Sequence, residues 1–126
     1  MGDPRHALGI AAEQAVGEWL EASGWRLLGR RVRASGGGEV DIVALDPNGV
    51  LVGVEVRARR TVRTGTGTES MTAERAGRTG RTVAAFAAAS RVDHRGLRLD
   101  LVSVMPEPGR GAGQWRLRRV PNVGGW

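Results

Sequence analysis

The chain has 126 residues, of which 40% are hydrophobic, enough for one domain with a sizeable core and too many for a wholly disordered chain. It has no Cys and two His, which excludes disulfide bonds, thiolate zinc sites and three-histidine metal sites. No apolar run approaches the ~18 residues of a membrane span, and the sequence starts without a secretion signal. We therefore expect a single soluble, cytoplasmic domain over residues 1–126.

Positive charge is concentrated in the second half of the sequence. The net charge is +6, and all 19 basic residues are Arg. Residues 1–60 contain eight Arg and eight acidic residues, whereas residues 61–126 contain 11 Arg and five acidic residues. A basic face attracts phosphates and releases counterions when it binds them, so nucleic acid is one candidate partner. A solvated, Arg-rich surface is the alternative.

Periodicity and turn residues predict seven elements. The expected elements are helices at 8–23 and 72–89 and strands at 25–33, 39–45, 50–57, 97–104 and 114–120. A loop is expected at 59–70 and a linker at 106–113. Gly77 and Gly80 each cost the second helix about 1 kcal/mol, so its first half needs support from packing.

The order α-β-β-β-α-β-β implies an α/β fold, with a mixed sheet of about four to five strands flanked by helices. The expected core spans about residues 8–104, and residues 106–126 form an edge strand and tail.

One hairpin loop fixes how the second and third strands face each other. Pro47 presets a type I turn and Gly49 accepts a left-handed bulge, which together predict a three-residue loop. Paired residues then have numbers that sum to 96, so Asp41 faces Glu55. By the same rule Glu39 faces Arg57, and all four side chains project from one face of the hairpin. The other face is expected to join the core through Val40, Ile42, Val52, Val54 and Val56.

The opposed acids Asp41 and Glu55 predict a cation site. Carboxylates about 5 Å apart repel each other unless a cation lies between them. Mg²⁺ commonly takes one or two carboxylates and completes its shell with water. The alternative is an ordinary half-exposed hairpin face whose acids pair with Arg57 and Arg59. We favour the metal site for two reasons. Two opposed acids without a bound cation would destabilise the hairpin. The dense valines indicate a central strand, where a polar side chain is costly unless it has a partner or a function.

Five short motifs resemble, in order and spacing, the YraN-like family of small bacterial proteins over about residues 8–104. They are Gly9-x-x-x-Glu13, Gly24, Gly38-Glu39-Val40-Asp41, Val54-Glu55-Val56-Arg57-x-Arg59 and Arg98-Leu99-Asp100-Leu101-Val102. The third and fourth motifs, which a short hairpin separates, are the part of the pattern that is specific to the family. The resemblance implies the restriction-endonuclease-like fold with the PD-(D/E)xK nuclease pattern, and a similarity to archaeal Holliday-junction resolvases.

The resemblance also implies roles for individual residues. Asp41 and Glu55 would be metal ligands, Glu13 on the first helix an additional ligand, and Glu39 a support beside them. Arg57 stands where the pattern has its Lys. The implied reaction is phosphodiester hydrolysis with Mg²⁺ or Mn²⁺, which polarises the scissile phosphate and lowers the pKa of the attacking water. The basic residue would position that water or stabilise the developing charge.

Three positions depart from the family pattern. Arg57 replaces the Lys, Arg31 replaces the usual Asn after the first strand, and Arg75 stands for a Lys on the second helix. An Arg cannot release its proton, so Arg57 serves as a cation but not as a base. Losing one preorganised catalytic group of this kind typically costs about 10²–10³ in rate.

Three functions therefore stay open. The first is a metal-dependent endonuclease, with branched or structured DNA among its candidate substrates. The second is a nucleic-acid-binding module that retains the fold without cutting. The third is a protein-interaction domain whose Arg face takes an acidic partner.

Arginines around the predicted site are the candidates for nucleic-acid binding. They are Arg59, Arg60, Arg63, Arg75 and Arg78. Arg contacts to phosphate fix position without reading sequence, so we expect structure-selective or non-specific binding. Asp100 is expected to be paired within a strand rather than to join the site. Junction nucleases often act as symmetric dimers, but no apolar stripe here marks a homodimer interface.

Overall fold

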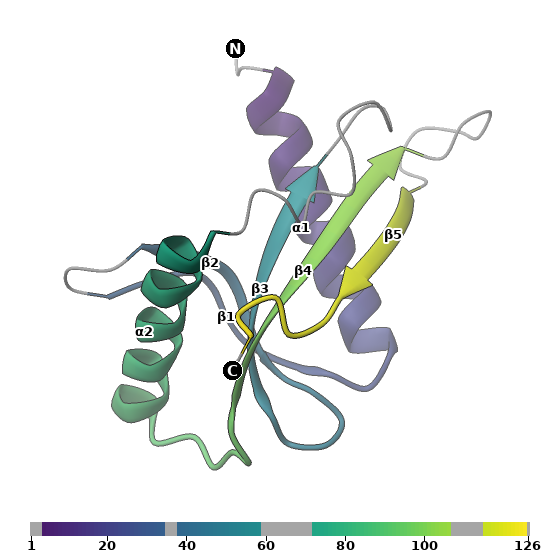
Figure 1. Cartoon of the computed structure of the whole chain (residues 1–126). Coiled ribbons are helices and arrows are strands. Elements are labelled where there is room, and N and C mark those ends of the chain that lie inside the picture. The colour runs from purple at the N-terminus through teal and green to yellow at the C-terminus, as the bar shows by residue number, and fades with distance from the viewer. Residues whose placement is uncertain (1–3, 35–37, 59–71, 107–114, 126) are drawn as a thin grey trace.

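The computed structural model describes residues 4–34, 38–58, 72–106 and 115–125 (Figure 1). Its elements are α1 (Pro4–Ala22), β1 (Arg26–Arg33), β2 (Glu39–Leu45), β3 (Leu51–Ala58), α2 (Ala73–Ser90), β4 (Leu97–Pro106) and β5 (Trp115–Val120). The predicted order of elements is confirmed, with small shifts at their ends. The predicted 59–70 loop lies outside the described residues, as does the 106–113 linker except for its first residue. Neither described helix has a stretch both long and apolar enough to cross a membrane.

The five strands form one mixed sheet in the order β1-β2-β3-β4-β5. The β3–β4 pair is parallel, because α2 makes the crossover between them, and the other three pairs are antiparallel. The predicted mixed α/β fold is thus confirmed. The last strand is an edge strand, as the sequence predicts.

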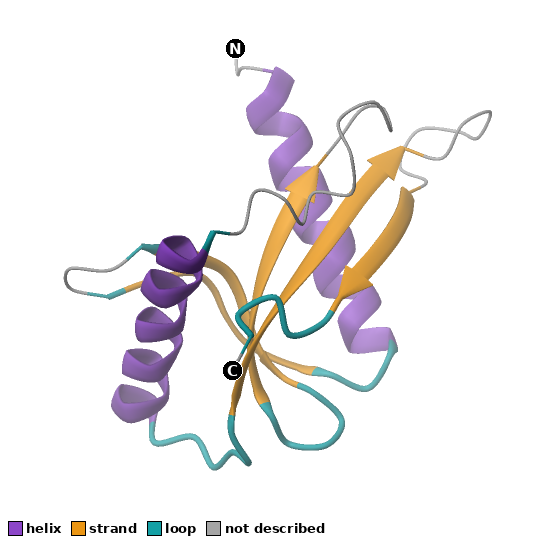
Figure 2. Cartoon of the chain, viewed as in Figure 1, coloured by secondary structure: helices purple, strands orange, loops and turns teal. Residues whose placement is uncertain are grey.

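The helices cover opposite faces of the sheet, so the core has two parts (Figure 2). The α1-side core contains Ala12, Val16, Leu20, Trp25, Ile42, Ala44, Val52, Val54, Val102 and Val104. The α2-side core contains Val40, Val43, Leu51, Ala76, Val83 and Leu99. The central strands β2, β3 and β4 contribute to both parts, which explains their high valine content.

The β2–β3 hairpin has the predicted loop. The Asp46 backbone N donates to the Val50 carbonyl at 2.9 Å, and the Gly49 N donates to the Asp46 carbonyl at 3.0 Å. Gly49 has φ 86°, the left-handed conformation that the bulge requires. The pairs from Ile42–Val54 to Leu45–Leu51 follow the predicted register.

One expectation for this hairpin is wrong, because β2 turns over near Asp41. Val40 packs in the α2-side core, whereas Ile42 packs in the α1-side core, so Val40 does not share a face with the other four valine and isoleucine residues. The β1–β2 register runs through Arg30–Ile42 and Val32–Val40 and omits the Arg31–Asp41 pair between them. Arg31 has φ 50°, a left-handed conformation that Asn adopts more readily than Arg.

Helix α2 packs closely on the centre of the sheet. A Cβ added at Gly53 would lie 3.0 Å from Leu99 Cδ2 and even closer to Val83 Cγ2, so only glycine fits there. The helix begins at Thr72, whose side chain accepts a hydrogen bond from the Arg75 N at 3.1 Å. Ala76 and Thr79 are buried, and this packing supports the glycine-containing first half of the helix.

A network of charged side chains lies on the α1 side of the sheet, where the β2–β3 loop meets β4. Asp100 is fully buried and receives Arg98 through two hydrogen bonds of 2.8 and 3.1 Å. Arg119 Nη1 adds a third at 2.8 Å, and Arg98 also reaches Asp46 Oδ2 at 3.0 Å. Both guanidinium groups lie over the Trp25 ring. The prediction that Asp100 is a paired strand residue is confirmed.

Candidate functional site

Asp41 lies where β2 and β3 separate. Their register ends at Ile42–Val54, and in a continued ladder the Val56 N–H would bond to the Val40 carbonyl. Instead the Val56 N donates to Asp41 Oδ2 at 2.8 Å. The Asp41 carboxylate therefore takes the place of a backbone acceptor, and this contact fixes the carboxylate beside β3.

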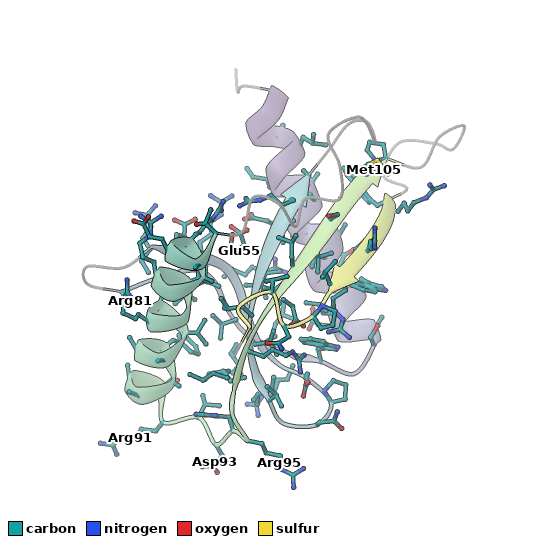
Figure 3. The ribbon with its side chains drawn as sticks, in the orientation of Figure 1. Glu55, Arg81, Arg91, Asp93, Arg95 and Met105 are labelled. Carbon is teal, nitrogen blue, oxygen red and sulfur yellow. The ribbon has the colours of Figure 1, made fainter. Side chains whose placement is uncertain are left out.

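Glu55 lies on β3, and its side chain projects to the α2 side of the sheet. It alternates with Val54 and Val56, which pack on the α1 side. Only 3% of the residue is exposed. Arg75, in the first turn of α2, places its Nη2 atom 3.4 Å from Glu55 Oε2. Figure 3 shows Glu55 beside the N-terminal end of α2.

The two carboxyl groups have raised pKa values. Burial raises the pKa of Asp41 from 3.8 to about 6, against the hydrogen bond from Val56 and with the nearby charge of Glu13 adding to the increase. Burial also raises the pKa of Glu55 from 4.5 to about 7, and the charge of Asp41 adds to that effect. Arg57 lies close enough to lower the pKa of both groups, but it does not cancel the increase.

Glu13 reaches Asp41 from the other face of the sheet. It lies on α1, where its charge and a side-chain hydrogen bond both raise the pKa of Asp41. Its carboxylate pairs with Arg31 Nη2 at 3.0 Å, and its backbone carbonyl accepts a hydrogen bond from Arg30 Nη1 at 3.2 Å. Because β2 turns over at Asp41, this residue interacts with Glu13 on the α1 side of the sheet and with Glu55 on the α2 side.

These three acids do not form a ready-made metal cage. Within the ranges that the structure describes, no group of three or more His, Asp or Glu side chains is arranged to hold a metal ion. The Asp41–Glu55 pair alone matches a cation that takes two carboxylates and several waters, as Mg²⁺ commonly does. Glu13 is engaged with Arg31 and would have to turn from it to bind the same ion.

The other predicted site residues divide into three groups. Glu39 pairs with Arg33 of β1 at 2.7 Å, and the register gives it no pairing with Arg57 because the β2–β3 ladder ends earlier. Arg75 pairs with Glu55, and Arg78 is exposed on α2. The predicted binding residues Arg59, Arg60 and Arg63 lie outside the described residues.

Sequence reasoning missed two contacts of this site. It placed Arg75 among phosphate-binding residues, whereas the structure places its guanidinium on the buried Glu55. It treated Arg31 only as a departure from a pattern, whereas Arg31 holds Glu13. Arg75 stands three residues after the helix-capping Thr72, so the sequence could predict that it lies in the first turn of the helix. The sequence could not predict that this turn packs over β3.

Comparisons with known proteins identify the family. The model of "Uncharacterised protein family UPF0102" matches residues 12–104. A UPF0102 protein of Symbiobacterium thermophilum is 41% identical over 92% of this chain and 94% of its own. UPF0102 proteins of Beutenbergia cavernae and Trichlorobacter lovleyi are 33% and 30% identical, over 95% and 98% of this chain and 98% and 94% of theirs. The chain therefore belongs to the UPF0102 family, the YraN family that its motifs resemble.

Proposed function

We propose that this protein binds nucleic acid at the separation of β2 and β3 and hydrolyses its phosphodiester backbone with a divalent metal ion. The observation that carries the proposal is the Asp41–Glu55 pair, a half-buried and a buried carboxyl group with pKa values of about 6 and 7 beside Arg57. Burying acids without enough compensating charge costs stability, so such a pair is a candidate functional site.

The donor set suits Mg²⁺ or Mn²⁺. Asp41 and Glu55 would hold the ion, and Glu13 is a further candidate once it leaves Arg31. Both metals prefer carboxylate and water oxygens, and neither needs the Cys or His ligands that this site lacks. Such an ion polarises a scissile phosphate and lowers the pKa of a bound water.

The protein residues would position the substrate and balance its charge. The hydrogen bond from Val56 fixes the orientation of Asp41, so this carboxylate is held in place before a ligand arrives. Arg57 lies within electrostatic reach of both acids and would stabilise negative charge that develops on a phosphate bound beside them. Arg75 and Arg78 on α2 extend the positive charge away from the acids.

A second candidate is a nucleic-acid-binding module that does not cut. Arg57 favours it, because an Arg keeps its proton at every physiological pH and cannot serve as a general base. If the reaction needs a base at this position, the protein binds its substrate and leaves it intact. Both candidates share the basic surface and the fold and differ only in the chemistry of the site.

The test is a cleavage and binding assay with linear and four-way-junction DNA, in which Mg²⁺ or Mn²⁺ is titrated. The nuclease proposal predicts metal-dependent cleavage that Asp41→Asn and Glu55→Gln each abolish. Asp93→Asn is the matched control, since Asp93 is an exposed acid at the other end of the molecule (Figure 3). Binding that is insensitive to metal, with no cleavage by the wild type, would instead support the non-catalytic module.

Arg57→Lys separates the two candidates further. If the site is intact and the missing amine is its defect, this variant gains a large factor in cleavage rate. If the variant binds DNA like the wild type and still does not cut, the non-catalytic module is supported. Binding that does not weaken with added salt would contradict both candidates, because several phosphate contacts require a steep salt dependence.

A further inference from the structure

A row of residues crosses the sheet from the candidate site to the edge strand β5. Arg57 of β3 pairs with Ser103 of β4, and Ser103 pairs with Arg118 of β5. Val56 and Val102, their neighbours in sequence, pack in the α1-side core, so this row projects to the opposite face. Arg118 therefore shares a face with Glu55 and Arg57, two strands away, or about 10 Å between backbones.

The charged residues of β5 and of β4 beyond Asp100 are all basic. Strand β5 reads Trp-Arg-Leu-Arg-Arg-Val and has no acid, and β4 has none after Asp100. Trp115 and Leu117 pack toward the α1-side core, which leaves Arg116 and Arg118 on the other face. Arg118 is exposed, and within the described part of the chain no ion pair or hydrogen bond involves its side chain.

Among the described residues, α2 and the C-terminal segment lie on this face of the sheet. Helix α2 packs on β1 to β4, and β5 forms an edge of the sheet (Figure 1). The C-terminal segment crosses β4 lower down, where the Val123 N donates to the Leu99 carbonyl at 2.9 Å. Met105 and Glu55 lie toward the end of the sheet away from Arg91 and Arg95 (Figure 3).

We propose that Arg118 is a phosphate-binding residue, and that a nucleic-acid strand bound at the candidate site runs across β4 to β5. This inference rests on the proposed function, since the site supplies the other end of the path. Charge complementarity selects the occupant, because phosphodiester groups are anionic and the row ends in exposed guanidinium groups. Arg116, opposite Met105 one row further on, extends the same path.

A competing explanation assigns the β5 arginines to protection of an exposed sheet edge. Charged side chains on edge strands prevent pairing with another chain. Under that explanation, Arg118→Gln changes the tendency to associate and leaves nucleic-acid affinity unchanged. Under ours, the variant stays as monodisperse as the wild type and loses affinity.

The experiment measures binding of wild-type, Arg118→Gln, Arg118→Lys, Arg57→Gln and Arg91→Gln proteins to a fluorescent DNA over a range of salt concentrations, with Ca²⁺ to prevent turnover. Arg91 is an exposed Arg at the far end of α2 and is the control for loss of one charge. We expect Arg118→Gln to bind about three- to tenfold more weakly, with the salt slope smaller by about one ion. Arg118→Lys should retain most of the affinity, and Arg91→Gln should match the wild type.

Each other outcome has a distinct meaning. If Arg118→Gln and Arg91→Gln weaken DNA binding equally, the loss of affinity comes from the lower net charge, and the path over β5 is overturned. An unchanged Arg118→Gln, alongside weakened binding by Arg57→Gln, would overturn the path while leaving the proposed function standing. A wild-type protein that binds no nucleic acid would overturn the proposed function itself.

Discussion

Two groups of buried or half-buried acids in this protein differ in the hydrogen bonds that the described residues donate to them. Asp46 and Asp100 lie on the α1 side of the sheet, and Arg98 and Arg119 meet them with hydrogen bonds of 2.8 to 3.1 Å. In the second group, the Val56 N donates to Asp41 at 2.8 Å and the Arg75 guanidinium lies 3.4 Å from Glu55. Among the described residues, guanidinium groups therefore approach the first group more closely than the second.

The pKa values of these acids follow the same division. Burial acts to raise the pKa of Asp46, but hydrogen bonds from the Val50 N and from Arg98 outweigh it, and the pKa is lowered. Burial raises the pKa of Glu55 to about 7, and Arg75 only limits the increase. Burial alone therefore does not decide whether an acid is charged, because the donors around it do. The first group is structural, and the second is the group at which we propose that a cation binds.

Removing an acid from the first group should have the largest effect on stability. Asp100→Ala leaves Arg98 and Arg119 without their shared partner and is expected to lower the free energy of unfolding by about 3–5 kcal/mol. Urea denaturation followed by circular dichroism measures it, with the exposed Asp93→Ala as a control within about 0.5 kcal/mol of the wild type. A loss below 1 kcal/mol for Asp100→Ala would show that the network contributes little.

Neutralising an acid of the second group should instead raise the free energy of unfolding. At pH 8 both carboxyl groups are charged, and Asp41→Asn keeps an oxygen for the Val56 N–H while removing the charge. We expect the free energy of unfolding to rise by about 1–3 kcal/mol at pH 8, since one pKa unit corresponds to about 1.4 kcal/mol. The same denaturation experiment measures it. A loss of stability in Asp41→Asn would mean that the charge is compensated after all.

The pH dependence of stability sharpens the same contrast. Well below their ordinary pKa values of 3.8 and 4.5, Asp41 and Glu55 are protonated in both the folded and the unfolded chain and do not affect stability. As the pH rises from there toward the folded pKa values of about 6 and 7, the unfolded chain releases these protons first, so the free energy of unfolding falls. Replacing both, in the double variant Asp41→Asn/Glu55→Gln, should flatten the stability profile between about pH 4 and 7. An unchanged slope would place the titrating groups elsewhere.

The smallest expected effect concerns Arg75, which is the main charge partner of Glu55. Its side chain is 35% exposed, so its ion pair is screened by water and contributes about 0.5 kcal/mol. Arg75→Met should therefore lower stability by about that amount at pH 8, where Glu55 is charged, and by less at pH 5, where Glu55 is protonated. Equal losses at both values would assign Arg75 a packing role instead.

Local signals in the sequence were sufficient to predict the hairpin and the order of elements. Pro47 and Gly49 specify the loop, and the loop determines the register that ends at Ile42–Val54, next to Asp41 and Glu55. That register was predicted to continue through Glu39, but the ladder ends at Ile42–Val54, and Glu39 pairs with Arg33 instead.

The rest depends on contacts between distant parts of the chain. Alternation of side chains cannot reveal that β2 turns over at Asp41, because the unusual conformation is at Arg31 on the neighbouring strand. The network around Asp100 joins Asp46 to Arg98, 52 residues apart, and only the assembled sheet brings them together. Likewise, the row from Arg57 to Arg118 follows only from the register of three strands.

Calorimetric titration of the protein with Mn²⁺ at pH 7.5 tests the central claim most directly. If Asp41 and Glu55 form a cation site, the wild type binds one ion and releases protons as it does so, because metal ligands must be deprotonated. Asp41→Asn should then bind no ion at the same concentrations, while Asp93→Asn binds like the wild type. A wild type that takes up no metal, or an Asp41→Asn variant that takes it up equally well, would contradict the account.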